Sequence, residues 1–118
     1  MYTLTIIMAW NTVGKPEDIE SGKMKEFDIN GKKVVISNFD NKYYAIDALC
    51  SHMGGDLGKG KTNSGVVVCP KHHAQFDLKT GKVTKNINGF FKAMTRKEAS
   101  DLKSYNTKVE DGNLMIDL

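Results

Sequence analysis

The side chains best suited to bind a soft metal ion are gathered in one stretch of the sequence. It begins at Cys50 and ends at His73, and it contains both cysteines and all three histidines of the chain. Four of these residues form two mixed pairs, Cys50 with His52 and Cys69 with His72. Thiolate sulfur and imidazole nitrogen are ligands of zinc and of iron, so the spacing predicts a metal centre with four ligands.

Two kinds of centre fit these four ligands. They could hold a structural zinc ion in a tetrahedral site. They could also hold a two-iron cluster with both cysteines on one iron and both histidines on the other. Common zinc modules pair cysteine with cysteine and histidine with histidine at short intervals, whereas each pair here contains one of each. The mixed pairs favour the two-iron cluster and leave zinc as the alternative.

Each pair follows a run of residues typical of a β-strand. The run "YAIDALC" ends at Cys50, and "GVVVC" ends at Cys69. Two loops that leave neighbouring strands can face each other and form one pocket. Glycines in and after the first loop would let the backbone approach a bulky centre without a Cβ clash. These glycines are Gly54, Gly55, Gly58 and Gly60.

The paired motif resembles that of the Rieske [2Fe-2S] family. The resemblance rests on Cys50-Ser-His52 and Cys69-Pro-Lys-His72, with "QFDLKTGKV" after the second pair. It implies one [2Fe-2S] cluster per chain, with Cys50, His52, Cys69 and His72 as its ligands. It also implies that both histidines lie near the surface, where electrons enter and leave.

The resemblance extends from about Trp10 to the C-terminus and implies a fold. We expect an all-β, Rieske-like fold of antiparallel sheets with one short helix. The chain would form a single domain over residues 1–118, with a small cluster-binding subdomain at about residues 49–79. Its length of 118 residues is near the common size of one domain.

The pattern of strands and turns independently favours an antiparallel all-β domain. Short runs rich in β-branched and aromatic residues alternate with two-residue turn signals. The expected strands lie in "KMKEFDI", "KVVISNF", "KYYAIDALC", "GVVVCP", "AQFDLKTGKVTK", "NTKVE" and "NLMIDL". The expected turns are Asn30-Gly31, Asp40-Asn41, Thr80-Gly81 and Asp111-Gly112.

One helix is expected, in a proline-free excursion over residues 86–105. Thr95 with Glu98 three residues later fits a capping box, and the helix would continue to about Lys103.

Composition narrows the class of protein. The formal charge of +3 comes mainly from scattered lysines with one arginine, which does not favour a nucleic-acid-binding protein. No apolar run approaches the ~20 residues of a membrane span, and the N-terminus lacks an export signal. We therefore expect a soluble, cytoplasmic monomer with no nucleic-acid or membrane partner.

Four positions depart from the high-potential respiratory members of the family. Those members carry a disulfide where Gly55 and Lys71 stand here, and hydroxyl groups where Ala74 and Phe76 stand. Hydrogen bonds to cluster sulfur stabilise the reduced state, so their loss lowers the potential. The resemblance therefore implies a low-potential centre.

No second reactive site is visible. Rieske oxygenases need a further iron held by two histidines and a carboxylate, and only His73 remains once the cluster has its ligands. We expect His73 to be exposed or to lie behind the ligands. The chain is therefore interpreted as an electron-transfer protein and not an enzyme. It would pass single electrons between a reductase and an acceptor such as an oxygenase.

Two alternatives to a free carrier remain open. The chain could be an accessory subunit of a larger reductase, similar to the Rieske-like small subunit of nitrite reductase. It could also be a structural zinc protein that uses the same four side chains.

Overall fold

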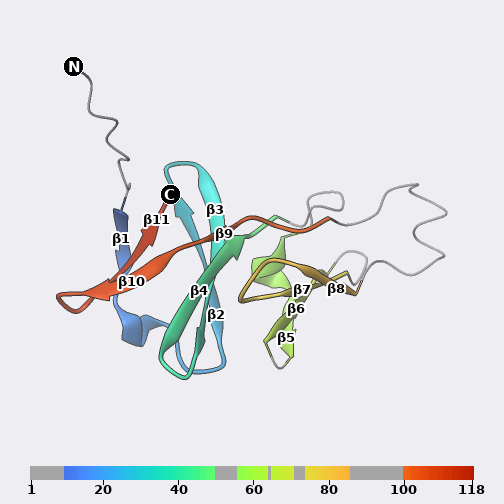
Figure 1. The fold of residues 1–118 in the computed structure, drawn as a ribbon, viewed down its shortest axis with the longest axis horizontal. Coiled ribbons are helices and arrows are strands. Elements are labelled where there is room, and N and C mark those ends of the chain that lie inside the picture. The colour runs from blue at the N-terminus through green and yellow to red at the C-terminus, as the bar shows by residue number, and fades with distance from the viewer. Residues whose placement is uncertain (1–9, 50–55, 64, 71–73, 86–99) are drawn as a thin grey trace, which may run out of the picture.

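The residues that the structure describes form three small antiparallel sheets. The computed structural model describes residues 10–49, 56–63, 65–70, 74–85 and 100–118. Within them the regular structure consists of strands and two short 3-10 helices, so the expected all-β fold is confirmed. The sheets follow one another across the molecule from left to right in Figure 1.

The first two sheets include strands from distant parts of the chain, whereas the third consists of four consecutive strands. The first sheet has the order β1 (Trp10–Gly14), β11 (Asn113–Asp117), β10 (Thr107–Glu110). The central sheet has the order β2 (Met24–Ile29), β3 (Lys32–Phe39), β4 (Lys42–Asp47), β9 (Ser104–Tyr105). The third sheet has the order β5 (Lys61–Asn63), β6 (Val66–Val68), β7 (Gln75–Asp77), β8 (Val83–Lys85).

Three of the predicted hairpin turns have the backbone that their sequence requires. Positive φ angles occur at both central residues of each turn, as in type I′ hairpins. The residues and angles are Asn30 (53°) with Gly31 (84°), Asp40 (53°) with Asn41 (63°), and Asp111 (51°) with Gly112 (76°). Asn, Asp and Gly tolerate this region better than other residues, so these turns set the strand register.

The central sheet is buried on both faces. In β3, Val34 and Ile36 pack in one cluster with Leu114 and Ile116 of the first sheet. Val35, between them, points to the opposite face. There it joins a second cluster that contains residues of the third sheet. The alternation of β3 therefore joins the three sheets through two separate cores.

The predicted helix is wrong where it can be tested. Residues 100–103 are not helical, and residues 86–99 lie outside the described residues. The N–H of Leu102 donates to the carbonyl oxygen of Gly81 (2.7 Å), and the carbonyl oxygen of Lys103 accepts from the N–H of Asp47 (3.0 Å). These bonds, to the turn between β7 and β8 and to β4, together with burial of Leu102, outweigh the local helical signal.

Two 3-10 helices and three strands were not predicted. The helices are η1 (Pro16–Asp18) and η2 (Leu57–Lys59), and the strands are β1, β5 and β9. In the described part of the chain, no helix is long and apolar enough to cross a membrane.

We predict that Phe76→Ala is strongly destabilising. Phe76 is fully buried in the core shared by the central and third sheets, and truncation leaves a cavity there. The expected loss in the free energy of unfolding is about 3–5 kcal/mol, measured by urea unfolding. Val109→Ala is the control, because Val109 is half exposed. Equal losses in the two variants would contradict this assignment of the core.

Candidate metal centre

The structure describes one of the four predicted ligands. Cys69 is a free thiol with 1% of its surface exposed, directly after β6. Cys50, His52 and His72 lie outside the described residues, as does His73. The described residues alone contain no group of three or more side chains that could hold a metal ion. The test of the site is therefore whether the protein brings the ends of both ligand-bearing loops together.

The first loop begins and ends at one point of the fold. An isolated antiparallel bridge joins Leu49 to Asp56 across the loop. At the next pair of residues away from the loop, the N–H of Leu57 donates to the carbonyl oxygen of Ala48 (2.7 Å). The side chain of Asp56 accepts from the N–H of Gly58 (3.0 Å) and so caps η2. Residues 50–55 are thus held between two ends that are hydrogen-bonded to each other.

The second loop is closed in the same way. The N–H of Cys69 donates to the carbonyl oxygen of Ala74 at 2.8 Å. The preceding residue, Val68, pairs with Gln75 in the ladder between β6 and β7. The loop that carries Cys69 and His72 therefore leaves and re-enters adjacent strands.

The ends of both loops are buried in the same core. Ala48 and Leu57, from the first loop, and Cys69 and Ala74, from the second, belong to one hydrophobic cluster. Each has 1% or less of its surface exposed. The ends of both loops are therefore packed against one another. This arrangement fits a centre with one sulfur and one nitrogen ligand from each loop.

A surface hollow of about 310 Å³ lies beside the buried thiol. It is lined by Lys59, Gly60, Lys61, Val68, Cys69 and Pro70. Gly60 is required here because a Cβ atom would lie 2.2 Å from the backbone oxygen of Val68. This close approach holds the end of η2 against β6, next to Cys69.

Two carboxyl groups meet at the end of the first loop. Glu26 on β2 hydrogen-bonds to Asp56, and this hydrogen bond raises the pKa of Glu26 and lowers that of Asp56. Burial raises the pKa of Glu26 further. Its Oε1 atom is buried and has no donor among the described residues. The pair is therefore stabilised when it holds one proton, with Lys33 and Lys59 nearby.

Two buried residues near Cys69 stand where the high-potential members of the family carry hydroxyl groups, and neither can donate a hydrogen bond. Ala74 and Phe76 are fully buried in the same cluster as Cys69. Their side chains carry only carbon, so they supply no donor to a sulfur atom.

Comparison with known proteins identifies the family. Residues 9–90 match the family described as Rieske [2Fe-2S] domain. Sulredoxin from Sulfurisphaera tokodaii is 30% identical over 111 residues, which is 94% of this chain and 100% of that protein. The ferredoxin component of the naphthalene 1,2-dioxygenase/salicylate 5-hydroxylase systems of a Ralstonia species is 27% identical over 107 residues, covering 91% and 93% of the two chains.

The fold agrees with this match. The ferredoxin of carbazole 1,9a-dioxygenase from Nocardioides aromaticivorans superimposes with a TM-score of 0.76, at 24% identity, over 92% of this chain and 96% of that chain. This chain belongs to the Rieske [2Fe-2S] family, and its cofactor is a [2Fe-2S] cluster. The buried free thiol and the two closed loops on one core fit that cluster.

Several residues that shape the site were not found from the sequence. Glu26 carries no local signal, because its partner is thirty positions later in the chain. Asp56 could have been found, since Asp before a turn of 3-10 helix is a common cap. Gly60 was predicted to let the backbone approach the metal centre, whereas the described structure requires glycine there because of the backbone oxygen of Val68.

We predict that Glu26→Gln removes a pH dependence of stability. The raised pKa of Glu26 means that its contribution is present at low pH and lost as the pH rises through that pKa, which lies above the ordinary 4.5. The lowered pKa of Asp56 means that its contribution is lost as the pH falls below 3.8. A glutamine amide donates to Asp56 without a titrating proton, so the variant should keep this hydrogen bond as the pH rises.

At neutral pH we expect the free energy of unfolding of Glu26→Gln to exceed that of the natural protein by about 0.5 kcal/mol. The gain is small because the pair is partly exposed to solvent. The measurement is urea unfolding at several pH values between about 4 and 8, a range that spans the ordinary pKa of a glutamate and neutral pH. Glu20→Gln, at an exposed position, serves as the control. A stability difference that does not change with pH would contradict the shared proton.

Proposed function

We propose that the chain is a one-electron carrier that uses its [2Fe-2S] cluster to pass electrons between a reductase and an acceptor. The observation that carries the proposal is the burial of both loop ends, with Cys69, in a single core. The four ends of the ligand-bearing loops therefore start from one core, which supports a single cluster with ligands from both loops. The cluster supplies reversible one-electron chemistry when bound.

The proposed ligands are the four side chains of the two mixed pairs. Cys50 and Cys69 would bind one iron, and His52 and His72 the other. The buried position of Cys69 supports this assignment, because an apolar surrounding protects an iron–thiolate bond from water. The two loop closures support equal contributions from both loops.

The proposed partners follow from the relatives. Relatives from Ralstonia and Pseudomonas putida are named ferredoxin components of naphthalene dioxygenase systems. One solved structure that shares the fold is a complex of an oxygenase and a ferredoxin of carbazole 1,9a-dioxygenase. We propose a terminal oxygenase as the acceptor of this chain.

We propose that the chain catalyses no reaction on a substrate of its own. Support comes from the single histidine, His73, that remains beside the four proposed ligands. We further propose a single domain over residues 1–118, with a cluster-binding subdomain at about residues 49–79, that acts as a cytoplasmic monomer. The accessory-subunit alternative would require a permanent partner, which gel filtration of the purified chain detects.

Metal analysis and paramagnetic resonance test the proposed ligands. The purified protein should contain two iron and two acid-labile sulfide atoms per chain. The dithionite-reduced protein should give a Rieske signal, with an average g value below that of all-cysteine clusters. His72→Ala should lose this signal, because one imidazole ligand is removed.

His73→Ala is the matched control, since it removes the neighbouring imidazole and should retain the signal. Loss of the signal in His73→Ala and its retention in His72→Ala would overturn the ligand assignment. A single zinc ion without sulfide would overturn the proposed function.

We also predict a low reduction potential. Rieske centres span roughly −150 to +300 mV, and hydrogen bonds to sulfur raise the value within that range. Since Ala74 and Phe76 offer no such donor beside Cys69, we expect a potential near the bottom of the range, with little change around neutral pH. Redox titration followed by visible absorption measures it. A potential above roughly +100 mV would contradict the argument.

A further inference from the structure

An exposed leucine lies directly before the first ligand-bearing loop. Leu49 has 49% of its surface exposed, although it directly follows the fully buried Ala48 and carries a large apolar side chain. It shares the bridge with Asp56 that closes the loop. Of the large apolar side chains that the structure describes, only Leu49 and Val109 are exposed to this degree.

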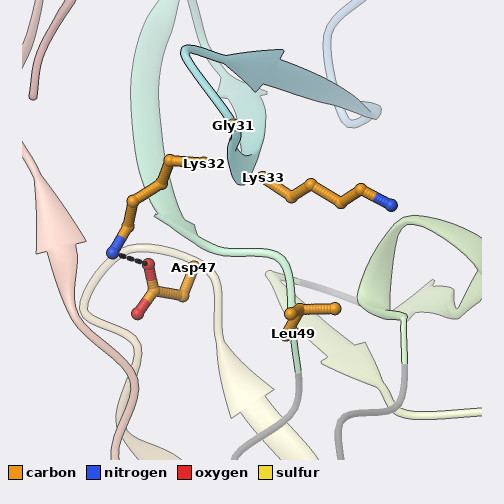
Figure 2. A pocket seen from close by; sticks show the side chains of 5 residues that line it. All are labelled: Gly31, Lys32, Lys33, Asp47 and Leu49. Carbon is orange, nitrogen blue, oxygen red and sulfur yellow. Dashed lines mark ion pairs between the residues drawn. The ribbon is translucent and has the colours of Figure 1, made fainter.

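Lysines surround this leucine. A hollow of about 250 Å³ is lined by Gly31, Lys32, Lys33, Asp47 and Leu49. Figure 2 shows Lys32 and Lys33 extending to opposite sides of the hollow, with Leu49 at its lower edge. The hollow lies at the end of the central sheet from which the chain enters the first loop.

The tyrosine of β9 positions two of the amines. The Nζ atoms of Lys32 and Lys103 lie 5.5 and 5.1 Å from the centre of the Tyr105 ring. The hydroxyl of Tyr105 donates to Asp47 (2.6 Å), and Asp47 is also 3.5 Å from the Nζ atom of Lys32. These contacts raise the pKa of Lys32, so its amine stays charged.

The acidic groups at this end are engaged within the protein. Asp47 accepts from Tyr105 and pairs with Lys32, while Asp56 caps η2 and is hydrogen-bonded to Glu26. The charges of Lys33 and Lys59 both act on the pair of carboxyl groups, which links the hollow at Leu49 to the one beside Cys69. Asp28, which pairs with Lys33 across β2 and β3, is exposed, and its carboxylate accepts from the N–H of Gly31 (3.0 Å). Lysines line both hollows, and each of these carboxylates already has a contact within the protein.

We define the lysine rim as the exposed lysines around Leu49 and the hollow beside Cys69. Its members are Lys32, Lys33, Lys59, Lys61 and Lys103. We infer that the lysine rim, with Leu49 at its centre, docks an acidic surface patch of the redox protein that exchanges electrons with this chain. The inference rests on the proposed function and adds the charge of the partner and the residues that meet it.

A charged rim around a small apolar centre suits a brief encounter. Complementary charges raise the association rate and orient the partners, whereas a small apolar contact allows rapid release. Nucleic acid is a poorer match for this surface. The described part of the rim contains no arginine, and both amines over Tyr105 occupy the ring on which a base would stack.

Small oxidants of opposite charge report the sign of the electrostatic potential at the surface through which electrons leave the cluster. The reduced holoprotein is oxidised by hexacyanoferrate(III), an anion, or by hexaamminecobalt(III), a cation, in stopped flow at low ionic strength. The variant Lys33→Glu with Lys61→Glu leaves the Lys32–Asp47 contact intact. Its control, Lys23→Glu with Lys42→Glu, has the same net charge but alters exposed lysines at the opposite end of the central sheet.

We expect the rim variant to react about tenfold more slowly with the anion than the control variant, and faster with the cation. The difference should fall as salt is added. Equal rates for the two variants with both oxidants would overturn the inference. The visible spectrum of each variant confirms that the cluster is intact before the comparison.

Calorimetry with poly-L-glutamate tests docking without electron transfer. The natural protein and the control variant should bind this acidic polymer, and the rim variant should bind it at least about fivefold more weakly. A copolymer of glutamate and tyrosine should bind more tightly than poly-L-glutamate, and Leu49→Ser should remove that gain. Binding of duplex DNA as tight as that of the polymers would overturn the inference in favour of a nucleic-acid surface.

The two proposals fail in different ways. If the natural protein takes up no electron reversibly, the proposed function fails, and the docking inference fails with it. If the electron is exchanged but the rim variant matches the control in kinetics and in calorimetry, only the docking inference fails.

Discussion

The arrangement of this protein depends on one shared hydrophobic core between the central and third sheets. Ala48, Leu57, Cys69 and Ala74 mark the ends of the two ligand-bearing loops, and all four are buried in that core with Phe76. Burial of apolar surface is non-directional, so it cannot place individual ligands. The backbone hydrogen bonds at each loop end add the direction, because they fix where each loop leaves the core.

The central sheet connects this core to the rest of the molecule. Val35 contributes to it, while Val34 and Ile36 pack on the opposite face against the first sheet. A further contact joins the third sheet to the central one at the far end, where the Nζ atom of Lys79 lies over the rings of Phe39 (5.6 Å) and Tyr44 (5.7 Å). The third sheet is therefore fixed to the central sheet both through the shared core and at the far end, which supports a rigid base for the loop ends.

At the end of the central sheet that carries the first loop, carboxylates and lysines have different roles. Carboxylates are used inside the protein: Asp56 caps η2 and pairs with Glu26, and Asp47 accepts from Tyr105. Lysines remain at the surface. Lysines line both hollows at this end, so the proposed docking depends on where the lysines lie and not on the modest formal charge of +3.

Local sequence determined much of this protein. Asn30-Gly31, Asp40-Asn41 and Asp111-Gly112 specified three hairpins, since few residues tolerate their positive φ angles, and the two mixed pairs of cysteine and histidine pointed to the family. Tertiary structure decided what depends on distant partners. The short strands β1, β5 and β9 form by pairing with other strands. Residues 100–103 are not helical despite their local sequence, because they hydrogen-bond to Gly81 and Asp47. The meeting of Glu26 with Asp56 and the lysine rim around Leu49 likewise arise from packing, because no local pattern records which side chains two separate strands bring together.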